Sequence, residues 1–270
     1  MKKTLPSLGP WAIITGASAG IGAGFARRLA AEGLNLVLVA RRAPLLESLA
    51  AELRASHGVE VRAHPADLSE PDAAEALATA TADLDVGLLV ANAGAARMGA
   101  FLKVGLRELA AMARLNVTTQ LALAHHFATR FAARPQGGGL LLVSSTVAYQ
   151  GIPYAANYSG AKAYLLNLGE ALNHELRGSG VHVTVLVPGP TDTPGLTGRD
   201  DANMVEHLPM RPQPVPALVR EGLAALLANE PSHIGGRVNR TMTRVMNAVL
   251  PRNTAVSFWG TQMQKMVHDK

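Results

Sequence analysis

The sequence predicts an α/β fold: a single domain built on a doubly wound parallel sheet, with helices on both faces. Short apolar runs alternate with helical patterns along most of the chain, and a glycine-rich turn joins the first apolar run to the first helical pattern. Continuous apolar strands separated by helices are typical of a parallel sheet that is covered on both faces. A hydrophobic content of 48% and a charged content of 17% agree with a globular protein.

The expected elements follow in chain order. Because crossovers between parallel strands are right-handed, their alternation indicates Rossmann-type connectivity. The expected strands are residues 11–15, 35–39, 59–63, 86–91, 139–144 and 182–187. The expected helices are residues 20–31, 44–55, 71–81, about 106–131, and 158–176.

Composition narrows the function classes. The 270 residues include no cysteine, which excludes disulfides, thiolate metal sites and cysteine nucleophiles. The nine histidines show no ligand spacing, so we expect no metal site. The net charge of +5 comes from residues 231–270 and lacks a basic–aromatic pattern, so we expect no nucleic-acid partner. No signal peptide or membrane span is recognisable, and we expect a cytoplasmic protein.

The turn after the first strand has the features of a dinucleotide site. A Cβ there would block close approach of the backbone to a pyrophosphate, and the following helix N-terminus offers N–H donors. Three glycines in a turn are a weak signal alone, but their place in a βαβ unit favours dinucleotide binding over a plain tight turn. The residues expected to bind are Gly16, Ser18, Ala19, Gly20, Ile21 and Gly22.

Two arginines, Arg41 and Arg42, follow the second strand. An enzyme that uses NAD typically has an acidic residue here for the ribose 2′-hydroxyl, but the first acid after Gly33 is Glu47. A guanidinium instead pairs with phosphate oxygens. The alternative is two solvated loop arginines, and we favour NADP(H) as the cofactor.

Further candidates follow the third and fourth strands, whose carboxyl ends share the ligand-binding edge of such sheets. Asp67, beside Leu68, is placed to accept from the adenine amino group. The Asn92-Ala93-Gly94 turn would let the backbone pass close to the ribose. Each of these features alone is more often ordinary turn chemistry.

The full set of motifs resembles the short-chain dehydrogenase/reductase superfamily, classical type. The match runs in order from residue 11 to about 230 and is far more specific than a lone Tyr-x-x-x-Lys. It rests on Thr15-Gly16, Gly20-Ile21-Gly22, Asp67, Asn92-Ala93-Gly94, Asn116, Ser145, Tyr158-Ser159-Gly160-Ala161-Lys162 and Pro188-Gly189. The resemblance implies an NADP(H)-dependent oxidoreductase that reduces a ketone or aldehyde, or oxidises the alcohol. We also expect a homo-oligomer, either a dimer or a tetramer.

Three residues are expected to perform the chemistry. Tyr158 would be the acid/base, although a free phenol has a pKa near ~10, too high for efficient work near neutrality. Lys162 lies four residues further on the same helix face, where its ammonium would lower that pKa. Ser145 ends the fifth strand and would stabilise the substrate oxygen. Ser144 is the weaker alternative, because strand alternation turns it the other way.

Other roles come from the resemblance alone. Lys162 would also hold the nicotinamide ribose, and Asn116 would hold a water that relays protons to this lysine. Pro188 and Gly189 would line the nicotinamide pocket, and Thr191 or Thr193 would bind the carboxamide. The alternative for Asn116 is a simple packing role in its helix.

The chain divides into a dinucleotide-binding and catalytic domain, residues 1–236, and an extension, residues 237–270. Residues 189–215 form a long Pro- and Gly-rich loop, and its apolar side chains, Leu196, Met204 and Leu208 among them, indicate a small apolar or amphipathic substrate.

The extension shows two apolar stripes at helical spacing. The stripes are Val238, Met242, Val245, Met246 and Val249, then Ala255, Trp259, Met263, Met266 and Val267. Its basic face would fit an anionic membrane surface, but we favour a helical hairpin packed on the same domain or on a partner subunit. Similar tails occur in the DltE-like branch of the superfamily.

Two other functions share these motifs. A dinucleotide-sensing regulatory protein on the same fold usually lacks an intact Tyr/Lys pair, which is present here. An epimerase or dehydratase of the extended family carries a larger substrate domain than this chain can hold. We therefore expect an oxidoreductase with a carbonyl or alcohol substrate.

Overall fold

The computed structural model describes residues 4–197 and 211–268. Within these residues the main sheet has seven parallel strands in the order β3-β2-β1-β4-β5-β6-β9. The doubly wound α/β fold is therefore confirmed. The strands are β1 (Trp11–Thr15), β2 (Asn35–Ala40), β3 (Val61–Pro65), β4 (Val86–Ala91), β5 (Gly138–Val143), β6 (Val181–Val187) and β9 (Ser232–Ile234).

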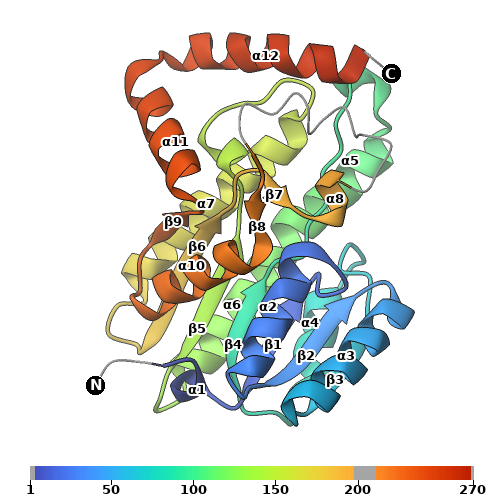
Figure 1. Cartoon of the computed structure of the whole chain (residues 1–270), viewed down its shortest axis with the longest axis vertical. Helices are drawn as coiled ribbons and strands as arrows, with labels where there is room; N and C mark the ends of the chain where they lie inside the picture. Colours follow the sequence, from blue (N-terminus) through green and yellow to red (C-terminus); the bar gives the residue numbers. More distant parts are fainter. Residues whose placement is uncertain (1–3, 198–210, 269–270) are drawn as a thin grey trace.

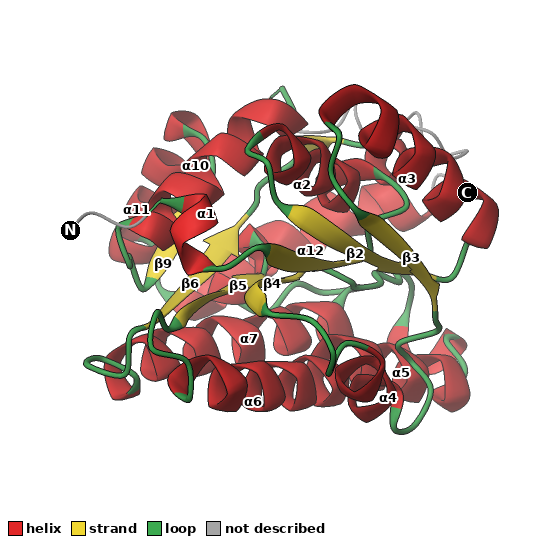
Figure 2. Ribbon diagram, turned by 90° about the horizontal axis from the view of Figure 1, so that it is seen from below, coloured by secondary structure: helices red, strands yellow, loops and turns green. Residues whose placement is uncertain are grey.

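Helices cover both faces of this sheet, as Figure 2 shows. Helices α2 (Gly20–Ala31), α3 (Ala43–His57) and α10 (Val215–Leu227) pack on one face. Helices α4 (Ala73–Ala80), α6 (Thr119–Ala132) and α7 (Ala156–Glu175) pack on the other. The remaining helices are α1 (Leu5–Leu8), α5 (Leu106–Ala113), α8 (Pro194–Thr197), α11 (Arg237–Val249) and α12 (Arg252–His268), with 3₁₀ turns at Phe101–Lys103 and Thr146–Tyr149.

The central strands form because they are almost wholly apolar and buried. All five residues of β1 are buried, and successive side chains alternate between the two faces. Ala12 and Ile14 join the core under α2, whereas Trp11 and Ile13 join the core under α6. The sheet is thus buried on both sides, and its carboxyl edge is left for ligands.

Several boundaries differ from the expected ones. The third strand begins at Val61 rather than at residue 59, because Gly58 ends α3 in a left-handed conformation with φ +67°. The long helical region near residues 106–131 is interrupted by a π-helical turn, Arg114–Thr118. Helix α10 is absent from the expected elements, although Leu218, Val219 and Leu226 are buried on one face of it.

The expected substrate loop is closed at its base. Two short strands, β7 (Thr191–Asp192) and β8 (Gln213–Pro214), pair in parallel, and the Gln213 backbone N–H donates to the Pro190 carbonyl at 2.8 Å. The two ends of the loop are therefore held together. Residues 198–210, including the expected pocket residues Met204 and Leu208, lie outside the described residues.

The extension forms two helices at the two predicted stripes. Helix α11 rises from the edge of the sheet, and α12 then crosses above the carboxyl ends of the strands (Figure 1). The stripe on α11 does not pack as its pattern indicates: Val238, Val245 and Val249 are exposed, and the buried residues of α11 are Asn239 and Thr243. No helix within the described ranges is long and apolar enough to cross a membrane.

Candidate active site

The turn between β1 and α2 fits a phosphate-binding loop. Gly16 and Gly20 have φ of +69° and +56°, a region that favours glycine, and a Cβ on Gly22 would overlap the Gly16 carbonyl oxygen. Helix α2 begins after Ala19, which makes no side-chain cap, and its first turn holds no acidic residue. The N–H groups and positive dipole end of α2 are therefore suited to an anion. Ile21 packs against the core instead.

A set of hydrogen bonds fixes this turn against β4. The Asn92 Nδ2 donates to the Thr15 carbonyl at 2.9 Å, and the Thr15 hydroxyl accepts from the N–H groups of Asn92 and Ala93, both at 2.9 Å. The Gln120 Nε2 donates to the Ala93 carbonyl at 2.8 Å. The Asn92 side chain is thus used to hold the glycine turn in place. Sequence reasoning missed Thr15 and Gln120 as supports.

The two arginines stand at the carboxyl end of β2. The Arg42 Nη2 donates to the Ser18 hydroxyl at 2.9 Å, and Arg41 Nη1 lies 3.8 Å from an Asp67 oxygen. Both arginines are exposed. This arrangement places two cations beside the glycine turn, where a 2′-phosphate of the bound nucleotide would be neutralised.

Asp67 and Leu68 form the next turn. The Asp67 carboxylate accepts from the hydroxyl and the backbone N–H of Ser69, at 2.7 and 2.9 Å, and these bonds hold the pKa of Asp67 below its ordinary value. Leu68 is buried, and its carbonyl accepts from the Thr119 hydroxyl at 2.8 Å. Asp67 is therefore ionised near neutrality and able to accept a further hydrogen bond.

The expected catalytic side chains converge from β5 and α7. The Ser145 hydroxyl hydrogen-bonds Tyr158, and Lys162 Nζ lies 5.7 Å from the centre of the Tyr158 ring. Ser144 faces away: its hydroxyl donates to the Lys162 carbonyl at 2.7 Å and is buried. The structure thus brings Ser145, rather than Ser144, to the tyrosine.

The electrostatics of the pair differ from the expectation. Burial raises the pKa of Tyr158, and the hydrogen bond with Ser145 offsets only part of that rise. Burial lowers the pKa of Lys162 to about 8, and its Nζ donates to the Val143 carbonyl at 2.8 Å. Burial therefore decides the direction of both pKa shifts, and each group is moved towards its neutral form.

Asn116 lies in the π-helical turn and faces the same region. Its side chain donates to the Ala95 carbonyl at 2.7 Å and accepts from the Ala95 N–H at 3.1 Å. A Cβ on Gly94 would lie 2.9 Å from Asn116 Oδ1 and 3.3 Å from Lys162 Nζ. Gly94 therefore leaves room for the amide and the ammonium to approach the fourth strand together.

The segment after β6 closes the other side. The Thr146 N–H donates to the Pro188 carbonyl at 2.9 Å, and the buried Thr191 hydroxyl donates to the Gly189 carbonyl at 2.9 Å. The Thr193 methyl lies against the glycine turn, 3.2 Å from where a Cβ on Gly20 would be. The Thr191 hydroxyl is thus used within the loop, while Thr193 lies beside the glycine turn.

The comparisons with known proteins agree with this arrangement. Residues 10–203 match the family model described as short chain dehydrogenase. The chain belongs to the short chain dehydrogenase family.

Relatives of known activity lie within this family. The chain is 32% identical to a 7beta-hydroxysteroid dehydrogenase of Clostridium sardiniense over 264 residues, which covers 96% of this chain and 97% of the relative. A solved structure from work on 7beta-hydroxysteroid dehydrogenase stereoselectivity has 32% identity and a TM-score of 0.88, covering 96% of this chain and 100% of that chain. A short-chain dehydrogenase of Sphingobium yanoikuyae in complex with NADPH has 33% identity and a TM-score of 0.77, covering 90% and 96%.

These matches confirm the family predicted from the sequence, and with it an oxidoreductase. The assignment to the DltE-like branch stays a prediction. Among the described residues of this short chain dehydrogenase, no group of three or more His, Asp or Glu side chains is placed to hold a metal ion.

One contact of the site was not foreseen. A Cβ on Gly189 would overlap the Asn239 side chain, so α11 of the extension packs directly on the segment expected to line the nicotinamide pocket. The Asn239 Nδ2 donates to the Gly235 carbonyl at 3.0 Å. No sequence signal links Asn239 to the site, because an isolated asparagine in a helical pattern is ordinary.

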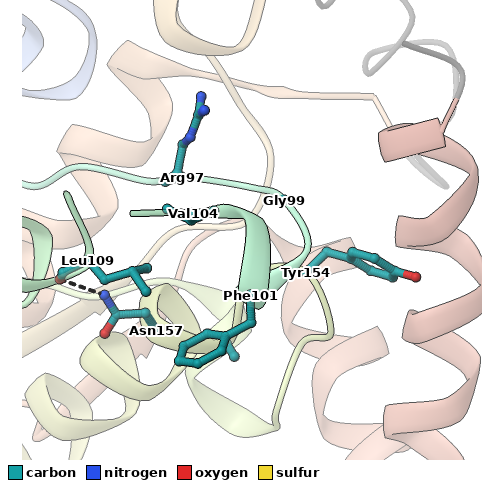
Figure 3. Close-up of a pocket in the computed structure, with 8 residues that line it drawn as sticks. Arg97, Gly99, Phe101, Val104, Leu109, Tyr154 and Asn157 are labelled. Carbon is teal, nitrogen blue, oxygen red and sulfur yellow. Dashed lines mark hydrogen bonds between the residues drawn. The ribbon is translucent and has the colours of Figure 1, made fainter. Parts of the chain in front are cut away.

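A pocket lies between the N-terminal end of α7 and the segment that precedes α5 (Figure 3). Asn157 donates to the Leu109 carbonyl at 2.8 Å and joins α7 to α5 at its base. The Phe101 side chain is 61% exposed. The lining residues are Arg97, Gly99, Phe101, Val104, Leu109, Tyr154, Ala156 and Asn157.

Proposed function

We propose that this short chain dehydrogenase transfers a hydride between NADP(H) and a bulky, mainly apolar ketone or its alcohol, with Tyr158 as the acid/base. The observation that supports it most is the Ser145–Tyr158 hydrogen bond, with Lys162 one helical turn away, at the carboxyl edge beside the glycine turn. The relatives named as 7beta-hydroxysteroid dehydrogenases support a rigid polycyclic substrate.

The residues that would hold NADP(H) are those around the glycine turn. The N-terminus of α2 would bind the pyrophosphate, and Arg41, Arg42 and Ser18 the 2′-phosphate. Lys162 and Asn116 lie beside Gly94, where the ribose next to the nicotinamide would pass. The bound nicotinamide supplies or accepts the hydride.

The state of Tyr158 suits reduction. Because burial raises its pKa, the phenol keeps its proton near neutrality and can donate it to the oxygen of a ketone as that oxygen gains charge. The Ser145 hydroxyl, which already bonds Tyr158, would stabilise the same oxygen. Alcohol oxidation needs the phenolate, so we expect it to speed up as the pH rises.

The test is a panel of ketones assayed by loss of NADPH absorbance. It contains cyclohexanone, 2-decalone and a 7-ketosteroid, with NADH in parallel. We expect turnover of the larger ketones, and faster turnover with NADPH than with NADH. Tight NADPH binding without turnover of any ketone or alcohol would instead indicate a dinucleotide sensor. The expected cytoplasmic location and homo-oligomer stay predictions.

A further inference from the structure

A third apolar cluster lies apart from the two cores that flank the sheet. It joins α12 to the segment that precedes α7, and it includes the expected catalytic tyrosine. Its buried members are Ile152, Ala155 and Met263, and Val147, Tyr154, Tyr158 and Trp259 pack against them. The position of α12 above the carboxyl edge is visible in Figure 1. The extension therefore reaches the side chains expected to meet the substrate.

The approach of α12 is close at backbone level. A Cβ on Gly260 would lie 3.3 Å from Pro153 Cγ, and one on Gly151 would lie 3.9 Å from a Val256 methyl. The next residue, Tyr154, has φ +62°, an unusual value for a non-glycine residue. Such backbone persists where the surroundings fix it, and it concentrates at ligand sites. Helix α12 thus lies directly on the segment that leads from Ser145 into α7.

Trp259 contains an unusual polar atom. Its indole Nε1 is shielded from solvent, yet it has no hydrogen-bond partner among the described residues. An indole N–H is a donor only, and buried ones normally find an acceptor, because a buried donor without a partner loses the hydrogen bond that it makes to water in the unfolded chain. The side chains packed with it are apolar apart from the hydroxyls of Tyr154 and Tyr158, and Phe258 makes an edge contact with its ring. A ligand oxygen would therefore find a ready donor at this position.

We propose that α12 is the outer wall of the substrate pocket, that Met263 packs on the substrate from this wall, and that Trp259 Nε1 donates to an oxygen of the substrate remote from the reacting carbonyl. The inference rests on the proposed function and narrows it. The substrate class is a rigid, mainly apolar ketone with a hydroxyl or carboxylate at its far end. The apolar cluster binds the ring system, and the single donor fixes its orientation.

Trp259→Phe tests the donor. The two probes are a 7-ketosteroid with one hydroxyl at the far end of its ring system and the same compound without that hydroxyl. We expect KM for the hydroxylated probe to rise about tenfold, with kcat within about twofold, and KM for the other probe to stay unchanged. Equal changes for both probes, or none, would overturn the assignment. Gln264→Ala, an exposed position on the same helix, is the control.

Met263→Ala tests the wall. We expect KM for both ketosteroids to rise several-fold and KM for cyclohexanone to stay unchanged, while Met263→Leu restores the ketosteroid values. Far-UV circular dichroism checks that each variant is folded. A loss that affects cyclohexanone equally would mean that Met263 supports the fold and does not bound the pocket.

A binding measurement separates this inference from the proposed function. The chain has two tryptophans, so Trp11→Phe leaves Trp259 as the one tryptophan, and its emission is followed by exciting tryptophan selectively. With NADP⁺ present no ketone can be reduced, and we expect a saturable shift in Trp259 emission as the hydroxylated ketosteroid is added. An unchanged emission, in an enzyme that turns over the same ketone with NADPH, would reject the wall and leave the proposed function intact. A shift in Trp259 emission without turnover of any ketone would support the wall and reject the proposed function.

Discussion

Tyr158 and Lys162 occupy similar surroundings with opposite consequences. Burial raises the pKa of the phenol and lowers that of the ammonium, so both groups are pushed towards their neutral forms. A neutral phenol is a competent proton donor, and a lysine that titrates near pH 8 can exchange protons close to physiological pH. These are the protonation properties that the proposed reduction needs in Tyr158 and Lys162.

Tyr158→Phe removes the proton donor and leaves the ring in place. We expect turnover of the best ketone to fall by at least about 10³-fold, while the dissociation constant for NADPH, measured by nucleotide fluorescence, changes by less than about twofold. The substitution removes only the hydroxyl and its interaction with Ser145, and the ring stays packed in its apolar cluster, so the fold should be kept. Retained turnover would remove Tyr158 from the mechanism.

Lys162→Met should stabilise the protein without nucleotide. The folded-state pKa of about 8 lies below the ordinary value of 10.5, so between pH 8 and 10 the unfolded chain binds more protons and the free energy of unfolding rises with pH. The variant should gain up to about 2 kcal/mol at pH 7, since the lost bond to Val143 offsets part of the relief, and should lose this pH dependence. Urea unfolding at pH 7, 8, 9 and 10 measures both. A variant less stable than the original protein at every pH would show that burial of the Lys162 ammonium does not destabilise the folded state.

At the scale of elements, the end of β2 is where the nucleotide preference should be decided. Arg41→Asp together with Arg42→Ala removes both cations and adds an acid for a ribose 2′-hydroxyl. We expect the ratio of kcat/KM for NADPH to that for NADH to fall by more than tenfold. Arg62→Ala, an exposed arginine on β3 that pairs with Asp83, is the matched control. An unchanged ratio would place the phosphate elsewhere.

The elements were predictable where one local pattern decided them. Strands β1 and β4 and helix α2 begin and end at the expected residues. Their apolar runs and the glycine turn between β1 and α2 allow one assignment of secondary structure. Helix α10 was not expected, since its apolar residues follow directly on the Pro-rich loop. The family motifs also brought Ser145, Tyr158 and Lys162 to attention as a set.

What the sequence could not show depends on contacts between distant segments. The face of α11 that packs contains Asn239 and Thr243, and no apolar stripe marks it. Thr15 supports the glycine turn only once β1 and β4 are neighbours. The direction of the Tyr158 pKa likewise follows from burial among residues far apart in the chain, which no spacing rule contains.

At the scale of the whole molecule, Glu221 joins the catalytic domain to the extension. Its carboxylate accepts from Gln213 Nε2 at 2.9 Å and from the Gly236 N–H at 3.0 Å. It also lies 3.1 Å from His233 Nε2 and 3.5 Å from Arg240 Nη2. Burial pushes the pKa of Glu221 up, but these bonds and charges outweigh it, and the pKa lies below its ordinary value. One side chain of α10 thus contacts the loop base, the last strand and α11.

Glu221→Gln should loosen the extension. Because the folded-state pKa is lowered, the stabilisation is complete above the ordinary value of 4.5 and is lost as the pH falls through the folded-state pKa. Since the side chain is partly exposed, we expect a loss of only about 1 kcal/mol at pH 7, shrinking below pH 4.5. Trypsin should cut sooner after Arg237 and Arg240. Glu70→Gln, an exposed glutamate, is the control, and equal trypsin sensitivity of both variants would contradict the role of Glu221.

The short ladder between β7 and β8 has a consequence for engineering. Thr191 and Gln213 are paired, so the two ends of the loop between them are held next to each other. The entropic cost of closing such a loop depends only weakly on its length. We therefore expect that this loop can be replaced by loops of other lengths. Segments transplanted from other reductases in place of the residues between Thr193 and Gln213 should change which molecules are accepted, while the parallel sheet and the contact of Thr193 with the glycine turn are kept.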